Sequence, residues 1–210
     1  MHPLHAALIA AANGQFVARD GRVEVYRPDV DEQQAVVEFT AHAFVLTDRD
    51  PDEVLARGAN GLGGASSPDL LRWLAGSDGW IGGHDVVLVA PGTGGGSLPE
   101  RNDLDDHPRV LRSREHRRDV RVYGDETGLV TIGRGLVDRL ELAVELLVQS
   151  EQRGGSGLRL IEAARASVPT GDLLWAQVAP GNAASLRAFL RSGFVPVGAE
   201  TLIGLPKTDI

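Results

Sequence analysis

Cysteine is absent from this chain of 210 residues. Its absence excludes disulfide bridges, a cysteine nucleophile and thiolate metal sites. The six histidines show neither H-x-H nor H-x-x-x-H spacing, so we expect no bound metal ion.

Positive charge and long apolar runs are also scarce. The chain has 21 lysines and arginines against 29 acidic residues, a net charge of −8. Proteins that coat nucleic acid are basic, so we expect no nucleic-acid partner. The apolar run 4–12 is shorter than the about 20 residues that span a bilayer, and no Lys or Arg precedes it as in a signal peptide. We therefore expect a cytoplasmic protein without a membrane partner.

The composition is otherwise that of a globular protein, with 42% hydrophobic and 24% charged residues. Residues 91–97 (PGTGGGS) predict a flexible loop and the clearest internal boundary. We expect residues 1–95 to be an N-terminal part of uncertain type, either an extension or the first elements of the same fold. Residues 96–210 are expected to form the core, within one compact domain. Strands and helices alternate most clearly after the loop, which favours an α/β (α+β) fold.

Hydrophobic periodicity and turn residues predict the individual elements. Helices are expected at 4–12, from residue 50 onward, at 70–74, 106–118, 157–167 and 182–192. Strands are expected at 16–18, 23–26, 35–46, 86–90, 120–123, 129–132, 140–148, 173–178 and 195–197, with a last apolar piece at 202–205. The first two strands are expected to form a hairpin around Asp20-Gly21, and residues 35–46 a single long strand.

One segment combines a strand, a glycine-rich turn and a helix. The strand at 140–148 runs into Gln152-Arg153-Gly154-Gly155-Ser156-Gly157, and a helix follows. Glycines let a ligand approach the backbone, and amides at the amino end of a helix bind phosphate. Ordinary turn chemistry explains the glycines equally well, and the spacing fits neither G-x-G-x-x-G nor a P-loop.

A second segment, residues 178–198 (VAPGNAASLRAFLRSGFVPVG), makes the pattern more specific. Together the two segments resemble the GNAT superfamily of N-acetyltransferases over roughly residues 120–200. Gln152-x-x-Gly155-x-Gly157 matches the superfamily's pyrophosphate loop, and Asn182 with Gly193-Phe194 matches its following helix and strand. The nearly lysine-free cation set is typical of members from GC-rich actinobacteria.

The resemblance implies a mixed, largely antiparallel twisted sheet flanked by helices, with acetyl-CoA as cosubstrate. In this superfamily the strand before the loop splays from its neighbour, here 140–148 from 173–178, and leaves a cleft for the pantetheine arm. The implied product is an acetylated primary amine, small molecule or peptide, formed by direct transfer because no cysteine can carry the acyl group. Dimers are common in the superfamily, which leaves a homodimer open. The residues implied to bind acetyl-CoA are Leu147, Val148, Gln152, Arg153, Gly154, Gly155, Ser156, Gly157, Leu158, Asn182, Ser185 and Phe189.

Two carboxylates are candidates for the general base that takes the amine's proton. The resemblance to the histone-acetyltransferase branch implies Glu141, and strand alternation puts Glu145 on the same face. The alternative is that they form structural ion pairs with Arg134 or Arg139. Asn182 has a comparable alternative as a helix N-cap.

Tyrosine is the remaining scarcity, with two residues in the chain. Many GNAT enzymes carry a tyrosine acid where this chain has Phe189, which has no proton to give. A non-catalytic acyl-CoA-binding or regulatory domain is therefore the alternative function. The basic segment 109–118 has two interpretations, a solvated helix face or a site that recognises an acidic group. The identity of the amine acceptor cannot be predicted from the sequence.

Overall fold

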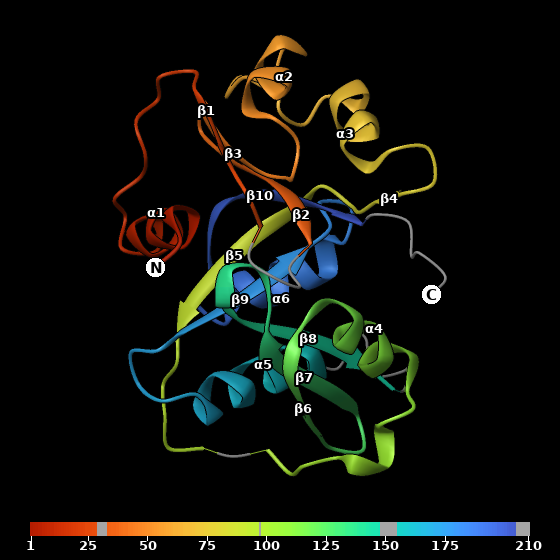
Figure 1. The fold of residues 1–210 in the computed structure, drawn as a ribbon. Coiled ribbons are helices and arrows are strands. Elements are labelled where there is room, and N and C mark those ends of the chain that lie inside the picture. The colour runs from red at the N-terminus through yellow and green to blue at the C-terminus, as the bar shows by residue number, and fades with distance from the viewer. Residues whose placement is uncertain (29–32, 97, 148–154, 205–210) are drawn as a thin grey trace. The chain divides into compact units, whose positions relative to one another are not determined.

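The computed structural model describes residues 1–28, 33–96, 98–147 and 155–204, and it divides the chain into two compact units (Figure 1). Unit 1 comprises Met1–Val87 and the chain from Val197 onward, and unit 2 comprises Leu88–Pro196. The boundary falls inside a strand, before residue 95, and residues 197–204 belong again to the first unit. In the described residues, no helix is both long enough and apolar enough to cross a membrane.

Unit 1 is built on a small sheet with strand order β1-β3-β2-β10. The strands are β1 (Val23–Tyr26), β2 (Gln34–Phe39), β3 (His42–Leu46), β4 (Trp80–Ile81), which pairs with β10, and β10 (Val195–Gly204). β1 runs parallel to β3, whereas β2 is antiparallel to both β3 and β10.

Two predictions in this unit are wrong. Residues 16–18 form no strand, so the hairpin around Asp20-Gly21 does not exist, and residues 23–26 pair with β3 instead. The expected strand at 35–46 is a hairpin that turns at Thr40-Ala41, with Ala41 at φ 55°. A continuous buried apolar run looks the same for one strand or two, and the turn lacks the glycine or asparagine that normally marks it.

The three helices that the structure describes in unit 1 begin in the same way. In α1 (Pro3–Ala12), α2 (Pro51–Ala56) and α3 (Pro68–Ala75), a proline follows a residue whose side chain accepts a hydrogen bond from a first-turn amide. Proline is preorganised for the first turn and lacks the amide that would need a partner. Val54 of α2 and Leu70 and Leu74 of α3 belong to one core cluster with Val36 and Val45 of the sheet.

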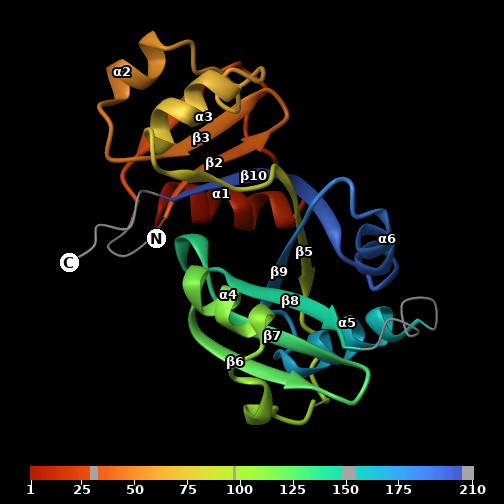
Figure 2. The same ribbon diagram turned by 90° about the vertical axis from the view of Figure 1, so that its right-hand side faces the viewer.

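Unit 2 has the strand order β5-β9-β8-β7-β6. Its strands are β5 (Asp85–Pro91), β6 (Arg118–Gly124), β7 (Gly128–Arg134), β8 (Leu140–Leu146) and β9 (Leu173–Val178); its helices are α4 (Pro108–His116), α5 (Ser156–Ser167) and α6 (Ala183–Arg191), with 3₁₀ turns η1 (Asn102–Leu104) and η2 (Leu136–Asp138). β6, β7 and β8 are antiparallel, and α5 carries the chain from β8 to the parallel strand β9. The predicted α/β fold with a mixed, largely antiparallel sheet is confirmed (Figure 2).

Helices cover opposite faces of the β6–β8 sheet. On one face the Ser113 hydroxyl of α4 hydrogen-bonds that of Thr131 on β7, 2.8 Å away. On the other face Leu160 of α5 packs so closely over Gly128 that a Cβ there would collide with it. Alternation along β7 separates Thr131 from Gly128, so each helix covers one set of side chains.

The described residues 91–96 of the predicted glycine loop form backbone hydrogen bonds with the end of α5. The amides of Thr93, Gly94 and Gly96 donate to the carbonyls of Arg165, Val168 and Ala166 at 2.9–3.0 Å. They cap the carboxyl end of α5, and glycine allows this approach because a Cβ at residue 92 would strike Val168 and one at residue 96 would strike Ala166.

Candidate functional site

The two parallel strands of unit 2 diverge soon after they meet. Between the described residues of β8 and β9, Glu141 with Trp175 is the only pair of residues in register. By contrast, β8 pairs with β7 along its whole length. Glu141 is near the start of β8 and Trp175 is in the middle of β9, so the strands separate toward their carboxyl ends. This is the divergence that the sequence resemblance implied.

Because of the divergence, the described residues of β8 after Glu141 have no paired residue in β9 for their backbone N–H and C=O groups. The Leu147 amide donates to the Thr127 carbonyl at 2.9 Å, so it is directed toward β7 and not toward β9. Successive residues of a strand direct their N–H and C=O groups to opposite sides, so those of Val144 and Leu146 point toward β9. Sequence reasoning missed this because the spacing to the loop does not reveal the phase of the hydrogen bonds. Val148 lies outside the described residues.

The amino end of α5 follows the divergence. Gly155 adopts φ 82° just before the helix, and no described side chain caps this end. A Cβ at Gly155 or Gly157 would meet no described atom within 4 Å, so packing does not require glycine at either position. Ser156 is buried and Leu158 is half-buried. Gln152, Arg153 and Gly154 were also predicted to belong to this loop, and they lie outside the described residues.

Helix α6 carries the last three predicted residues. The Asn182 side chain accepts a hydrogen bond from the Ser185 amide at 3.2 Å, which is the N-cap arrangement expected as its alternative role. Ser185 is half-buried. Phe189 is buried, and its ring packs edge-on against Phe194 with centroids 5.0 Å apart. The position of the usual acid is therefore filled by core packing.

Glu141 lies between two arginines. Its carboxylate accepts from Arg139 at 2.7 Å and from Arg117 at 2.8 Å, and the Glu141 side chain is 7% exposed. Burial by itself would raise the pKa of the Glu141 carboxyl, but the positive charges of Arg139 and Arg117 outweigh burial and hold it below its ordinary value. A carboxylate stabilised in this way is a weak base, so the environment favours the ion-pair role over the base role.

The arginine partners were only partly predicted. Arg139 was expected, but Arg134 donates instead to the Asp138 carbonyl. Arg139 also lies over the Trp175 ring, 5.6 Å from its centroid, and Arg117 donates to the Gln177 Oε1 at 3.2 Å. These contacts join residues from β8, β9 and the segment after α4. Nothing in the sequence marks such a cluster, because its members are up to sixty positions apart.

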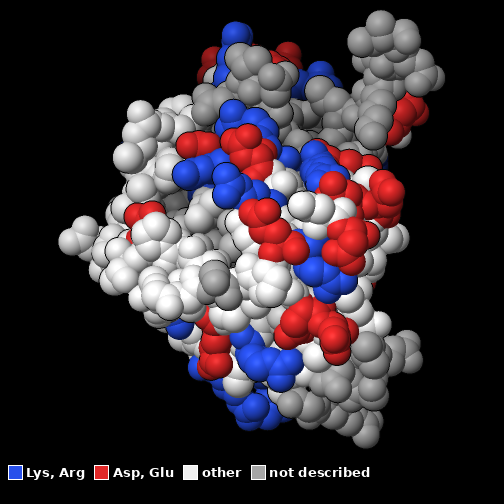
Figure 3. Space-filling view, turned by 90° about the horizontal axis from the view of Figure 1, so that it is seen from below, with Lys and Arg blue, Asp and Glu red and all other residues white. Residues whose placement is uncertain are grey.

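The second candidate base is also paired. Arg109 donates to Glu145 at 2.6 Å, and each side chain is 37% exposed. Other arginines of the basic segment have acidic partners, since Arg114 binds Asp105 and Arg118 binds Asp138. Both signs of charge are interspersed on the face drawn in Figure 3. The segment therefore fits a charge-balanced helix better than a site for an acidic group.

No model of a known protein family matches this chain, and a search of curated proteins gives no significant match. Within the described residues, no group of three or more acidic, histidine or cysteine side chains is arranged to hold a metal ion.

Proposed function

We propose that unit 2 binds acetyl-CoA where β8 and β9 diverge, and that the protein transfers the acetyl group to a primary amine. The observation that carries the proposal is the single paired position, Glu141 with Trp175, before the strands separate toward α5. A divergence of these two strands is what the motifs of the GNAT superfamily lead one to expect.

Two further observations fit the ligand. No described atom would meet a Cβ at Gly155 or Gly157, at the amino end of α5, where backbone amides and the helix dipole favour a pyrophosphate. The Nε2 of Gln177, on β9 beyond the paired position, is buried and has no partner among the described residues. A carbonyl of the pantetheine arm would satisfy this donor, which is otherwise costly to bury.

When bound, acetyl-CoA supplies an activated thioester. The residues of the chain would bind and orient it through the amides of α5 and the β9-facing backbone of Val144 and Leu146. Transfer is direct, because the chain has no cysteine to carry the acyl group. The amine must lose a proton, and Glu141 stays our predicted base, with Glu145 second, although both are held by arginines.

The surroundings of the reaction follow from the same reasoning. We place the protein in the cytoplasm, with a small-molecule or peptide amine as its partner and without nucleic acid or membrane. No metal is needed for acyl transfer from a thioester.

The second candidate, a non-catalytic acyl-CoA-binding domain, is favoured by two specific observations. Phe189 is buried against Phe194 in place of the usual acid, and Glu141 is held as an anion by two arginines. Both would allow ligand binding while leaving proton transfer unsupported.

The deciding experiment combines calorimetry with a transfer assay. We expect acetyl-CoA to bind and CoA to be released in the presence of at least one amine from a panel. Gly157→Glu should reduce affinity by at least tenfold, because it places an anion where the pyrophosphate would lie, while an acidic residue in the first turn does not destabilise the helix. Leu111→Glu adds the same charge at an exposed position of α4 and should leave affinity unchanged.

Each outcome has a definite meaning. Binding without turnover on any amine supports the non-catalytic domain and overturns the transferase. No binding by the folded protein, or equal binding by the Gly157→Glu variant, overturns both.

A further inference from the structure

Unit 2 contains a pocket of about 300 Å³ that none of the predicted site residues lines. It forms because α5 ends at Ser167, before it has covered the whole sheet, and the chain leaves in an extended conformation at Val168. The side chains of Arg134 and Leu140, which pair where β7 ends and β8 begins, are therefore not covered by α5. Its volume is at the lower end of the about 300–1,000 Å³ that is usual for small-molecule sites.

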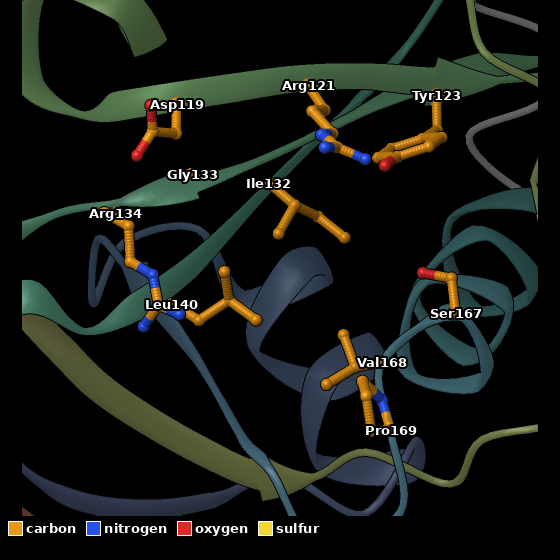
Figure 4. A pocket seen from close by; sticks show the side chains of 10 residues that line it. All are labelled: Asp119, Arg121, Tyr123, Ile132, Gly133, Arg134, Leu140, Ser167, Val168 and Pro169. Atoms are coloured by element: carbon orange, nitrogen blue, oxygen red, sulfur yellow. The ribbon is translucent and has the colours of Figure 1, made fainter.

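The strand side of the pocket carries hydrogen-bond donors. Strand alternation and register put Arg121 and Tyr123 of β6 on the same face as Ile132 and Arg134 of β7 (Figure 4). Among the described residues, the Arg121 side chain and the Tyr123 hydroxyl form no hydrogen bond or ion pair with one another or with other groups. Arg134 is oriented by its bond to the Asp138 carbonyl, 3.1 Å away, which leaves further guanidinium donors.

Among the described residues, those on the opposite side of the pocket offer no hydrogen-bond donor. The Ser167 hydroxyl donates to the Ala164 carbonyl at 2.7 Å, so its oxygen can only accept. Val168 and Pro169 complete this side, and Ile132 and Leu140 add apolar surface from the sheet. Figure 4 shows Ile132, Leu140 and Val168 converging on the same space. The cationic donors of the pocket therefore all come from the strands, whereas apolar groups come both from the strands and from the segment after α5.

The end of a nearby helix does not cancel this positive character. The carboxyl end of a helix carries partial negative charge, which disfavours anions. In α5, however, the carbonyls of Arg165 and Ala166 accept bonds from the glycine loop and are not exposed to a ligand. The acidic residue among those that line the described pocket, Asp119, is exposed and lies within the register shift between Arg118 and Arg121 of β6.

We propose that this pocket binds a small organic carboxylate with an apolar chain or ring. The carboxylate would accept from Arg121 and Arg134, for which a planar guanidinium is suited, and from the Tyr123 hydroxyl. The apolar part would lie against Ile132, Leu140 and Val168. The site is distinct from the proposed acetyl-CoA site, whose residues line no part of it.

The test is a titration of the whole protein with octanoate and with benzoate, in which binding is measured by calorimetry and by NMR chemical shifts. We expect micromolar to low-millimolar affinity for at least one acid, and at least tenfold weaker binding of octanol and octylamine. Arg121→Gln and Arg134→Gln should each weaken acid binding by at least fivefold. Arg112→Gln, an exposed arginine of α4 outside the pocket, should change it by less than twofold.

A second variant tests the apolar side without removing charge. Val168→Phe should fill the pocket and abolish binding, and a melting temperature close to that of the parent shows that the fold persists. Acetyl-CoA affinity is measured in the same samples and should not change in any of these variants, so this proposal can fail independently of the proposed function.

Several results would overturn the proposal. These are the absence of acid binding by the folded protein, equal binding of octanol, undiminished binding by both arginine variants, and equally tight binding of inorganic phosphate, which needs no apolar surface. Preference for octanoate over benzoate, or the reverse, decides between a flexible chain and a ring.

Discussion

Each of the two units contains a buried polar side chain between two charged side chains, but these charged partners differ in burial. In unit 1, His42 contacts Asp20 at 2.9 Å and Glu24 at 3.1 Å; in unit 2, Glu141 contacts Arg139 and Arg117. The partners of His42 have side chains 31% and 40% exposed, whereas those of Glu141 are 0% and 12% exposed.

The difference in burial sets the energetic consequences. Water can solvate Asp20 and Glu24 if His42 is lost, because both carboxylates reach the surface. Arg139 cannot reach water, so it depends on Glu141 to compensate its charge. Unit 2 thus carries the more vulnerable cluster, and this cluster adjoins the position where β8 and β9 diverge.

The largest effect should come from Glu141→Gln. We expect the free energy of unfolding to fall by about 3–5 kcal/mol, because removing one partner leaves uncompensated buried charge. Urea denaturation measures the loss. Glu145→Gln is the matched control, because its pair with Arg109 is more than one-third exposed, and it should cost no more than about 1 kcal/mol.

The same variant tests the predicted base. If Glu141 takes the amine's proton, any acetyl-transfer activity of the folded variant should fall while acetyl-CoA affinity holds, and the acidic limb of the pH profile should change. An unchanged rate and profile would remove Glu141 from the mechanism. Equal destabilisation by both glutamine variants would contradict the difference between buried and exposed pairs.

An intermediate effect is expected from His42→Leu. The substitution removes two hydrogen bonds from a buried ring but leaves carboxylates that water can reach, so we expect a loss of about 1–3 kcal/mol. The urea midpoint relative to the parent protein gives the value. A loss as large as that of Glu141→Gln would show that exposure of the partners does not moderate the cost.

The smallest effect concerns Tyr26, whose hydroxyl donates to Glu24 beside His42. The hydrogen bond to Glu24 raises the pKa of Tyr26 from 10.0 to about 12, and burial and the Glu24 charge act in the same direction. A raised pKa means that the contribution to stability is complete below pH 10 and is lost as the pH rises toward 12.

Tyrosinate absorbance during a pH titration should therefore show one ionisation near pH 12. With two tyrosines, one lysine and no cysteine in the chain, few groups titrate in this range. Tyr26→Phe should abolish this ionisation and Tyr123→Phe should retain it. An ionisation of Tyr26 near pH 10 would mean that its bond to Glu24 does not persist in solution.

Local signals predicted much of the fold. Prolines after Asp50 and Ser67 marked the starts of α2 and α3, and Asn182 marked that of α6. The strand 173–178 was predicted to the residue. Prediction failed where no local residue signals the outcome, as at Ala41, where an alanine adopts a positive φ, and at residues 195–204, where two apolar pieces belong to one strand.

The site was less predictable than the fold. The glycines before α5 and the order of strand, loop and helix could be found from the sequence. The direction of the Leu147 amide could not, because it depends on the pairing of β8 with β7. The contact of Arg117 with Glu141 and the pocket beside Arg121 were equally hidden, since both join segments that are distant along the chain.

The sequence by itself determined what chemistry is excluded and which elements form. The lack of cysteine, the scarcity of tyrosine and the spacing of apolar residues are properties of the chain, and turns and caps are decided by neighbouring residues. Tertiary structure alone decided that Glu141 is an ion-paired anion, that Phe189 is a core residue, and that α5 ends before it covers Arg121 and Leu140. Burial and electrostatic environment arise from contacts between distant segments, so they could not be predicted before the strands were paired.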